Sequence, residues 1–317
     1  MCEIWTMGEI LVEIMRPRVG MPLYQAGEFN GPFPSGAPAI FIDTVARLGH
    51  SAGIIGGVAD DDFGKCLLKR LENDGVDTSR VLKSETGSTA VAFVTYFADG
   101  SRKFIFHIDG TPAVRAVAPR HSNDLRGVKF FHIMGCSLMT SERFGREILK
   151  TMNVMRAAGA KISFDPNIRP ELMKSSSGMK LVRSVMKHCS IFEPGVSELL
   201  MMSGEKTVEE AVAACFKNPK LELIALKEGS RGCTIYTRTD AVRMGVYPVK
   251  VLDATGAGDC FDGALLCALL EGMSLVEAGE YATAAASLNT AAFGPMEGQI
   301  SQSTMADIMK GTIEARQ

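Results

Sequence analysis

The residue types best suited to chemistry gather in one glycine-rich segment, Asp253-Ala254-Thr255-Gly256-Ala257-Gly258-Asp259. Gly256 and Gly258 have no Cβ, so the backbone N–H groups around them can approach an oxyanion closely. An apolar helical pattern begins just after the segment, and the N-terminus of a helix adds partial positive charge at the same place. The segment therefore predicts a phosphate-binding turn with the Asp259 carboxylate beside it.

Other kinds of glycine-rich turn fit this segment less well. A dinucleotide-binding turn would need a third glycine at the position of Phe261, and the sequence has no Gly-x-x-x-x-Gly-Lys-Ser/Thr loop. A plain turn in which Asp259 caps a helix would account for the segment equally well if it stood alone. The distinction therefore depends on the rest of the chain.

Strand-like and helix-like patterns alternate along most of the sequence. Such alternation predicts an α/β fold, a three-layer αβα sandwich with a mostly parallel central sheet. We expect residues 246–251 to form the strand that leads into the glycine-rich turn. Sheets of this kind bind ligands beyond the carboxyl ends of their strands, so residues 165–169 and 256–259 are predicted to share one edge. The other expected strands are 128–134, 161–165, 190–193, 223–227 and 233–237, and the expected helices are 142–158, 178–188, 207–216, 262–271 and 275–292.

Two β-patterned stretches interrupt this alternation. Residues 9–15 are followed by the turn-rich stretch 16–34, and residues 90–97 are followed by 103–107 after an Asp99-Gly100 turn. No helical pattern separates the strands within either stretch. We therefore expect a small separate sheet, inserted at about 9–34 and 88–112 into a single domain that spans residues 1–317.

Composition limits the function classes. The chain has 317 residues, 46% of them hydrophobic and 22% charged, enough to bury the core of one sizeable domain. A formal net charge of −2 gives no basic field, so nucleic acid is not expected as a partner. No apolar run approaches about 18 residues, so neither a membrane span nor a secretion signal is expected. Eight cysteines without a Cys-x-x-Cys pair predict reduced core thiols and a cytoplasmic location.

Several further motifs occur in an order that resembles the PfkB (ribokinase-like) carbohydrate kinases along nearly the whole chain. The glycine-rich segment resembles the C-terminal signature of that family. Phe164-Asp165-Pro166-Asn167-Ile168-Arg169 resembles the strand end of its fructokinase and 2-keto-3-deoxygluconate kinase branch. The remaining matches are Met7-Gly8-Glu9-Ile10 and residues 34–39, 46–49, 56–64, 193–198 and 227–232.

The resemblance implies a ribokinase-like fold whose small sheet is a lid over a sugar site and often a dimer contact. A lid has a physical purpose, because a site that activates ATP must exclude water. The implied activity is transfer of the γ-phosphoryl group of ATP to a primary hydroxyl of a ketohexose, fructose or tagatose, with 2-keto-3-deoxygluconate as the next substrate. A nucleoside kinase and a catalytically silent sugar-binding relative are the alternatives. The implied cofactors are ATP and Mg²⁺, with a monovalent cation as an open question, and the implied assembly is a homodimer through the lid.

The resemblance also assigns site residues. The amides of Gly256, Ala257 and Gly258 would stabilise the transferred phosphoryl group, and Asp259 would take the proton of the sugar hydroxyl. The helix N-terminus is expected to favour ionised Asp259 and so to make it a weak base. The nucleotide would contact Lys227, Gly229, Gly232 and Thr283, the sugar would contact Glu13, Gly36, Asn167 and Arg169, and the metal would be held through Glu198.

Ordinary structural roles compete with some of these assignments. Glu198 could be an exposed first-turn acid of a helix, and Asn167 and Arg169 could belong to a satisfied turn. Arg102 and His107 lie on the expected lid hairpin, where they could contact the substrate, although a solvated lid face is the stronger prediction for both. The chain also departs from the family, because Gly195 stands where the family has Asn before the metal-linked Glu, Ser35 replaces a glycine, and Ile40 replaces a sugar-binding Asn. These changes indicate a substrate other than ribose.

Overall fold

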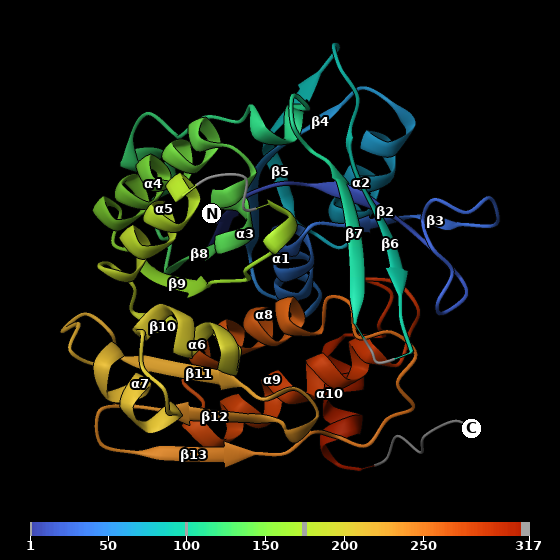
Figure 1. Cartoon of the computed structure of the whole chain (residues 1–317). Helices are drawn as coiled ribbons and strands as arrows, with labels where there is room; N and C mark the ends of the chain where they lie inside the picture. The colour runs from blue at the N-terminus through green and yellow to red at the C-terminus, as the bar shows by residue number, and fades with distance from the viewer. Residues whose placement is uncertain (1, 99–100, 173–175, 312–317) are drawn as a thin grey trace.

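A nine-stranded sheet runs through the middle of the molecule in the computed structural model, which describes residues 2–98, 101–172 and 176–311, without the side chains of 123–124 and 176–177 (Figure 1). Its strand order is β13-β12-β11-β10-β9-β8-β1-β4-β5, and every neighbouring pair is parallel except those that involve β12. The strands are β1 (Ile4–Met7), β4 (Ala52–Ala59), β5 (Asp77–Ser84), β8 (Phe130–Met134), β9 (Lys161–Asp165), β10 (Ile191–Phe192), β11 (Leu223–Lys227), β12 (Cys233–Tyr236) and β13 (Ala241–Met244).

Helices lie on both faces of the sheet, as the alternating sequence pattern predicts, because a parallel strand must be covered on both sides. The residues of β1, β4, β8 and β10 are all buried. Helices α3, α4 and α5 pack together, and α1, α8 and α9 pack together elsewhere (Figure 1). The helices are α1 (Ala37–Arg47), α2 (Asp62–Asn73), α3 (Gly135–Thr140), α4 (Glu142–Ala157), α5 (Ser176–Met186), α6 (Val196–Ser203), α7 (Val208–Cys215), α8 (Ala257–Leu270), α9 (Leu275–Thr290) and α10 (Gln302–Met309).

The small separate sheet has four strands in the order β3-β2-β6-β7. The pair β6 and β7 is antiparallel, whereas β2 and β6 are parallel. Strand β3 lies within a stretch that was expected to be mostly turn, and the predicted Asp99-Gly100 turn lies outside the described residues. Alternate residues of β7 face the main sheet and the solvent, so the sheet has an inner and an outer face. Its strands are β2 (Leu11–Met15), β3 (Asn30–Ser35), β6 (Ala90–Tyr96) and β7 (Arg102–His107).

The predicted strand at 246–251 is wrong. This segment has no regular structure and crosses α9 instead of joining the sheet, with the N–H of Tyr247 donating to Oγ of Ser287 and the N–H of Leu252 donating to the carbonyl of Thr290. Pro248 has no N–H to offer a neighbouring strand. The alternating valines therefore line a cavity against the helix and do not mark a strand.

Helix α8 begins at Ala257, earlier than the predicted start at 262. Apolar periodicity becomes visible only at Asp262, because the first turn consists of small and charged residues, Ala257-Gly258-Asp259. The last three residues of the motif therefore form the first turn of the helix, where backbone N–H groups have no intrahelical partner.

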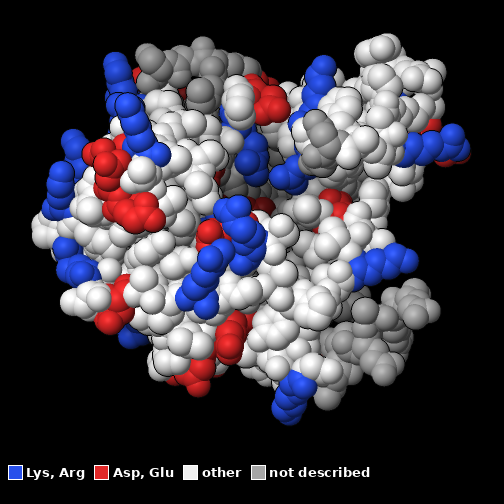
Figure 2. Space-filling model, turned by 60° about the horizontal axis from the view of Figure 1, so that its bottom comes forward, with Lys and Arg blue, Asp and Glu red and all other residues white. Residues whose placement is uncertain are grey.

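The described helices and one face of the molecule bear on two properties, a membrane span and surface charge. None of the described helices is long and apolar enough to cross a membrane. On the face shown in Figure 2, basic and acidic side chains are interspersed around a central hollow. A small ligand would therefore be held by local groups in a cavity and not by a general surface charge.

Candidate active site

Two adjoining cavities lie where the lid sheet meets the carboxyl ends of the central strands. The first has a volume of ≈ 320 Å³ and is bordered by the lid, α1, the end of β9 and the start of α8. The second has a volume of ≈ 420 Å³ and lies between residues 246–251 and α9. Lys227, Gly229, Ala254 and Gly258 border both cavities. A ligand with an apolar end and an anionic end could therefore extend from one cavity into the other.

Every site residue predicted from the sequence borders one of these cavities. The structure thus gathers residues from the two ends of the chain, as well as from its middle, into one place. The first cavity is lined by Glu13, Gly36, Asn167, Arg169, Glu198, Lys227, Gly229, Gly256, Gly258 and Asp259, and the second is lined by Ala257, Gly232 and Thr283.

The glycine-rich segment needs its first glycine for the backbone conformation. Gly256 caps α8 with φ 79°, and a Cβ at this position would lie 2.3 Å from the carbonyl oxygen of Pro295. The N–H of Ala257 lies 3.4 Å from the carbonyl of Ala254, which is a long contact. Among the described residues, the amides of Gly258 and Asp259 make no hydrogen bond, so the first turn of α8 presents free donors beside both cavities.

Asp259 is buried at the wall of the first cavity, where its Oδ1 accepts a hydrogen bond of 3.0 Å from Nδ2 of Asn167. Burial raises the pKa of Asp259 to about 6, and the charge of Asp165 adds to this increase, whereas Arg169 and Lys227 oppose it. The pKa of Asp259 is therefore shifted in the direction opposite to the one that the helix N-terminus alone would give. Asp259 is a stronger base than the sequence indicates.

Asn167 is held in an unusual backbone conformation directly after β9. Its φ of 39° is the one positive value that the described non-glycine residues show, and its N–H donates to Oδ1 of Asp165 at 2.9 Å. The side-chain Nδ2 reaches Asp259, while the side-chain Oδ1 is buried without a hydrogen-bond partner among the described residues. Since strained backbone and unpaired buried oxygens cluster at functional sites, Asn167 has the features of a site residue.

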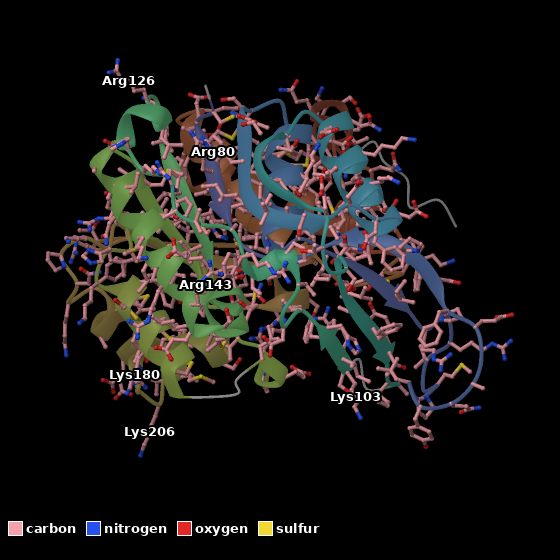
Figure 3. All side chains as sticks on the ribbon, turned by 90° about the horizontal axis from the view of Figure 1, so that it is seen from above. Arg80, Lys103, Arg126, Arg143, Lys180 and Lys206 are labelled. Atoms are coloured by element: carbon pink, nitrogen blue, oxygen red, sulfur yellow. The ribbon has the colours of Figure 1, made fainter. Side chains whose placement is uncertain are left out.

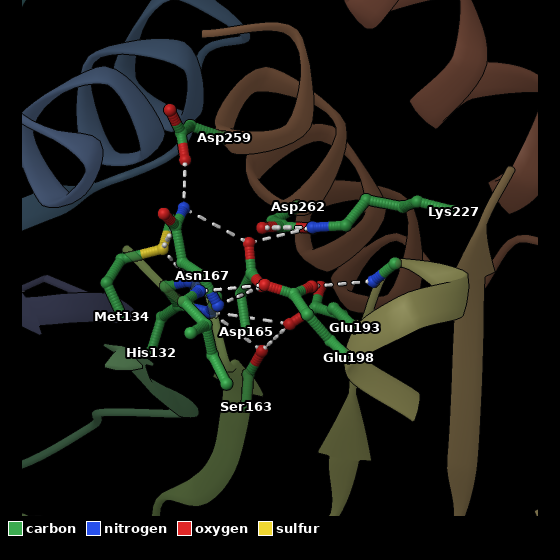
Figure 4. Close-up of polar contacts among 12 residues, drawn as sticks. His132, Met134, Ser163, Asp165, Asn167, Glu193, Glu198, Lys227, Asp259 and Asp262 are labelled. Carbon is green, nitrogen blue, oxygen red and sulfur yellow. Dashed lines mark hydrogen bonds and ion pairs between the residues drawn. The ribbon is translucent and has the colours of Figure 1, made fainter. Parts of the chain in front are cut away.

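The side chain of Lys227 reaches a buried carboxylate cluster from one side (Figure 4). Its Nζ is 2.8 Å from Oδ2 of Asp165 and 2.8 Å from Oδ1 of Asp262. Burial disfavours ionised Asp165, yet the Lys227 ammonium holds the pKa of Asp165 below its usual range. Oxygens of Asp165, Asp259 and Asp262 also lie within 4.8 Å of one another. The Lys227 charge is therefore the counter-ion of this cluster.

Asp165 and Asp262 were not among the predicted site residues. Asp165 belongs to the strand-end motif and Asp262 follows the glycine-rich motif by one turn, so both carried a sequence signal. Their pairing with Lys227 joins residues 62 and 35 positions apart, and this separation has no local pattern. Only the fold shows that these side chains share one cation.

Glu198 is not an exposed helix acid. It lines the first cavity, and its two oxygens accept hydrogen bonds of 2.8 Å from the N–H groups of Ile168 and Gly195. Burial raises the pKa of Glu198, and the charge of Asp165 adds to the increase. Gly195, which replaces the family's Asn, meets the same carboxylate through its backbone. Each oxygen of Glu198 keeps a second lone pair for another partner.

The opposite wall of the first cavity contains Glu13, whose Oε1 accepts a hydrogen bond of 2.7 Å from Oγ of Ser35. The other oxygen, Oε2, is buried and has no partner among the described residues. Burial raises the pKa of Glu13 to about 7. Gly36 follows with φ 104°, and Ile40 borders the same cavity. A hydroxyl-bearing ligand could satisfy the unpaired Glu13 oxygen.

Two further charged residues line the first cavity. Glu9 was not predicted as a site residue, and Arg102 was expected on a solvated face. Glu9 is buried and accepts hydrogen bonds from Oγ of Ser137 at 2.5 Å and from Sγ of Cys136 at 3.3 Å. Arg102 lines the cavity and donates to Oγ1 of Thr255 at 3.3 Å, so its predicted position on a solvated face is wrong. Strand alternation could have placed Arg102 inward, because it shares its face with Phe104 and Phe106.

The second cavity is mostly apolar. Its lining includes Val246, Val249 and Phe261, together with the aromatic ring of Tyr247. Thr283 lies on α9 at this wall, and its hydroxyl donates to the carbonyls of Gly279 and Glu280. An apolar slot of this kind suits a flat ring system better than a sugar.

Comparison with known proteins gives matches over most of the chain. A profile described as pfkB family carbohydrate kinase matches residues 31–302. Fructokinase-2 of Solanum lycopersicum is 32% identical over 276 residues, which cover 86% of this chain and 84% of that protein. Fructokinase-1 of Zea mays is 31% identical over 309 residues, which cover 93% of this chain and 95% of that protein.

Solved structures with the same fold include an E. coli protein provisionally described as a ribokinase II. Its apo form has a TM-score of 0.91 and 37% sequence identity, covering 98% of this chain and 100% of that chain. Its complex with ATP and Mg²⁺ has a TM-score of 0.90 at the same identity and coverage. The ribokinase-like fold predicted from the sequence is therefore confirmed.

Proposed function

The chain belongs to the pfkB family of carbohydrate kinases and is an ATP-dependent phosphotransferase that acts on a sugar; we propose that its acceptor is the primary hydroxyl of a ketohexose, fructose or tagatose. The similarity to plant fructokinases over most of both chains supports this choice. The observation that carries it is the buried Asp259 carboxylate, which lies beside free first-turn amides where two cavities meet.

Asp259 acts in this proposal as the base for the acceptor hydroxyl. Because its pKa is about 6, the Asp259 carboxylate is mostly ionised at neutral pH, yet it is basic enough to accept a proton. Asn167 holds Oδ1, and Oδ2 has no hydrogen bond among the described residues. The hydroxyl proton therefore passes to Oδ2 as the sugar oxygen bonds to the γ-phosphorus and the bond from that phosphorus to the bridging oxygen breaks, so that ADP leaves with the electron pair.

The first-turn amides of α8 stabilise the charge that spreads over the transferred group. Gly258 and Asp259 supply free N–H donors, Gly256 fixes their direction, and Ala257 has only a long internal contact to give up. Loss of one such donor typically costs about 3 kcal/mol of transition-state stabilisation. Arg169, whose guanidinium makes only a 3.5 Å contact to the carbonyl of Ile168 among the described residues, can add positive charge in the first cavity.

The donor nucleotide is assigned to the second cavity. Gly229, Gly232 and Thr283 line the wall of this cavity, and Lys227 would lie near the phosphates of the nucleotide. Carboxylate oxygens are ligands that Mg²⁺ accepts, and Glu198 fits this role directly or through water, since both its oxygens retain a lone pair. Bound Mg²⁺ would neutralise phosphate charge. Gly195 contacts Glu198 only through its backbone N–H, so the side-chain contact that the family's Asn makes is not replaced by Gly195 itself.

A sugar acid is the second candidate acceptor. Arg102 and Arg169 both line the first cavity, and a guanidinium binds a carboxylate in a bidentate manner. 2-Keto-3-deoxygluconate carries such a group, whereas fructose and tagatose do not. Glu13 with its unpaired oxygen can accept a hydrogen bond from a hydroxyl of either candidate, so the choice between them depends on whether the two arginines bind a carboxylate.

Dimerisation through the lid sheet and a cytoplasmic location belong to the same proposal. The outer lid face and the loop before β3 expose large side chains, among them Tyr24 at 92%, Val19 at 65% and Ile105 at 42%. Burying these against a second copy would be favourable. All eight cysteines are free thiols, which suits a reducing compartment. Light scattering with wild type and with Ile105→Lys tests the dimer, and fractionation of cells tests the location.

The experiment that tests the function measures ADP release with fructose, tagatose, 2-keto-3-deoxygluconate, ribose and nucleosides as acceptors, in K⁺ and in tetramethylammonium salts. We expect fructose or tagatose to give the highest kcat/KM, and Asp259→Asn to bind ATP normally while turnover falls by several orders of magnitude. A nucleoside as the best acceptor would refute the proposal. Absence of any stimulation above basal ATPase would favour a silent binding protein.

A further inference from the structure

The lid sheet and the glycine-rich segment are joined by a continuous line of hydrogen bonds. Nη1 of Arg102 donates to Oγ1 of Thr255 at 3.3 Å. The hydroxyl of Thr255 is in turn hydrogen-bonded to the hydroxyl of Tyr96. The Tyr96 hydroxyl donates to Oδ1 of Asp253 at 2.8 Å. Two lid residues thus alternate with two residues of the segment.

The direction of these bonds follows from the groups at the two ends. A guanidinium can only donate and a carboxylate can only accept, so the Thr255 hydroxyl accepts from Arg102 and gives its own hydrogen to Tyr96, which donates to Asp253. Hydrogen bonds arranged in one direction polarise one another, and this line has opposite charges at its ends. Burial raises the pKa of Tyr96, with a further contribution from Asp253, so the phenol stays protonated and keeps its donor.

On the side of the glycine-rich segment, the same residues determine the backbone that leads into α8. Oδ1 of Asp253 also accepts a hydrogen bond of 2.9 Å from the N–H of Thr255, and its Oδ2 accepts one of 3.1 Å from Gly294. The carbonyl of Thr255 accepts a bond of 2.8 Å from Nδ2 of Asn289. Gly256 and the first-turn amides follow directly. A shift of Thr255 must therefore move the phosphate-binding donors.

On the lid side, Tyr96 is the last residue of β6 and Arg102 is the first residue of β7, so both stand at the end of the lid hairpin nearest the segment. Arg102 and Thr255 also line the first cavity. An acceptor in that cavity would thus lie against the line of hydrogen bonds. The hairpin cannot lift from the cavity without breaking all three of these hydrogen bonds.

We propose that Tyr96 is a positioning residue that couples closure of the lid over the acceptor to placement of the phosphate-binding amides of α8. The inference rests on the proposed function, because it assigns Tyr96 a part in the same phosphoryl transfer. Tyr96 itself does not line either cavity and acts through Asp253 and Thr255. The coupling makes a complete donor set depend on a closed lid, which limits ATP hydrolysis in the open site.

The test uses Tyr96→Phe, which deletes the hydroxyl and keeps the ring. We expect kcat with the best sugar to fall on the order of 10- to 100-fold, because small misplacements of catalytic groups cost this much, while the Kd for ATP changes by less than about 3-fold. Lys103→Ala is the matched control, since Lys103 is exposed on the same hairpin and points away from the body of the molecule (Figure 3).

A second measurement needs no turnover. Amide hydrogen exchange of residues 253–260 should become faster in Tyr96→Phe than in wild type and Lys103→Ala, because the segment loses its tie to the lid. Wild-type exchange rates and kcat in Tyr96→Phe would overturn the inference. If no sugar is phosphorylated by the wild type, the proposed function fails, and unchanged exchange in the variant would then separately refute the coupling.

Thr255 provides a further check if Tyr96→Phe does not fold. Thr255→Ser keeps the hydroxyl and should preserve the wild-type exchange rates of the segment, whereas Thr255→Val removes it and should reproduce the faster exchange expected for Tyr96→Phe. Equal exchange in the two Thr255 variants would contradict the proposal, because the hydroxyl would then make no difference. A difference between them would support it.

Discussion

The side-chain amide of Asn167 donates a 3.0 Å hydrogen bond to Asp259, although Asn167 follows β9 and Asp259 lies in the first turn of α8. In this position the backbone of Asn167 has a φ of 39°, which few non-glycine residues adopt. Figure 4 shows the amide between the Asp259 and Asp165 carboxylates. One residue thus orients the proposed base and separates it from a second negative charge.

Removal of the Asn167 amide should impair catalysis more than sugar binding. We expect Asn167→Gly, which tolerates the positive φ, to lower kcat by about 10- to 100-fold because Asp259 loses its orientation. The KM for the sugar should change much less. Steady-state kinetics test this, with thermal unfolding to confirm a folded variant. A change confined to KM would instead show that Asn167 binds the sugar directly.

The pH dependence of kcat/KM should have an acidic limb near pH 6. The proposed base must be ionised, and its pKa is raised to about 6, so activity falls tenfold for each unit of pH below this value and is flat above it. Initial rates at saturating ATP between pH 4.5 and 8 measure the profile. A limb near pH 4 would mean that Asp259 is not desolvated in the working enzyme, or that another group is the base.

Lys227→Met should destabilise the fold strongly. The substitution leaves the buried carboxylates of Asp165 and Asp262 without their counter-ion, and removal of one partner of a buried ion pair typically costs about 3–5 kcal/mol. Urea unfolding gives the loss. The double variant Lys227→Met with Asp262→Asn should recover part of it, and the exposed Lys217→Met should change the free energy of unfolding by less than about 0.5 kcal/mol. Equal stability of Lys227→Met and wild type would remove the counter-ion role.

Ile40→Asn should shift acceptor preference toward ribose. Ile40 is buried at the wall of the first cavity, where the family carries a sugar-binding Asn, so the new amide would face the acceptor. We expect the ratio of kcat/KM for ribose to that for fructose to rise about tenfold, the effect of one added hydrogen bond to a sugar hydroxyl. Ile40→Leu is the control and should leave the ratio unchanged. An unchanged ratio in Ile40→Asn would place this residue away from the acceptor.

The sequence alone determined the fold class, and it indicated residues that line the two cavities, whose roles stay predictions. Strands 161–165 and 223–227 appear at their predicted bounds, because buried parallel strands are short apolar runs whose ends carry a distinct polar motif. The glycine-rich motif was recognisable because its chemistry needs residues without a Cβ at fixed spacing. The division into a single domain with two lid insertions stays a prediction.

Tertiary structure decided what depends on neighbours distant in the sequence. Residues 246–251 have a strand-like pattern, yet α9 supplies their hydrogen-bond partners, so they line a cavity. The pKa of Asp259 is raised by burial and by the charge of Asp165. Neither effect can be read from the position of Asp259 at the start of a helix. Arg102 faces inward, the Lys227 ammonium bridges two carboxylates, and Tyr96 reaches Asp253, because long-range packing brings these side chains together. Sequence spacing specifies which groups are available, whereas burial and charge in the folded chain set how they act.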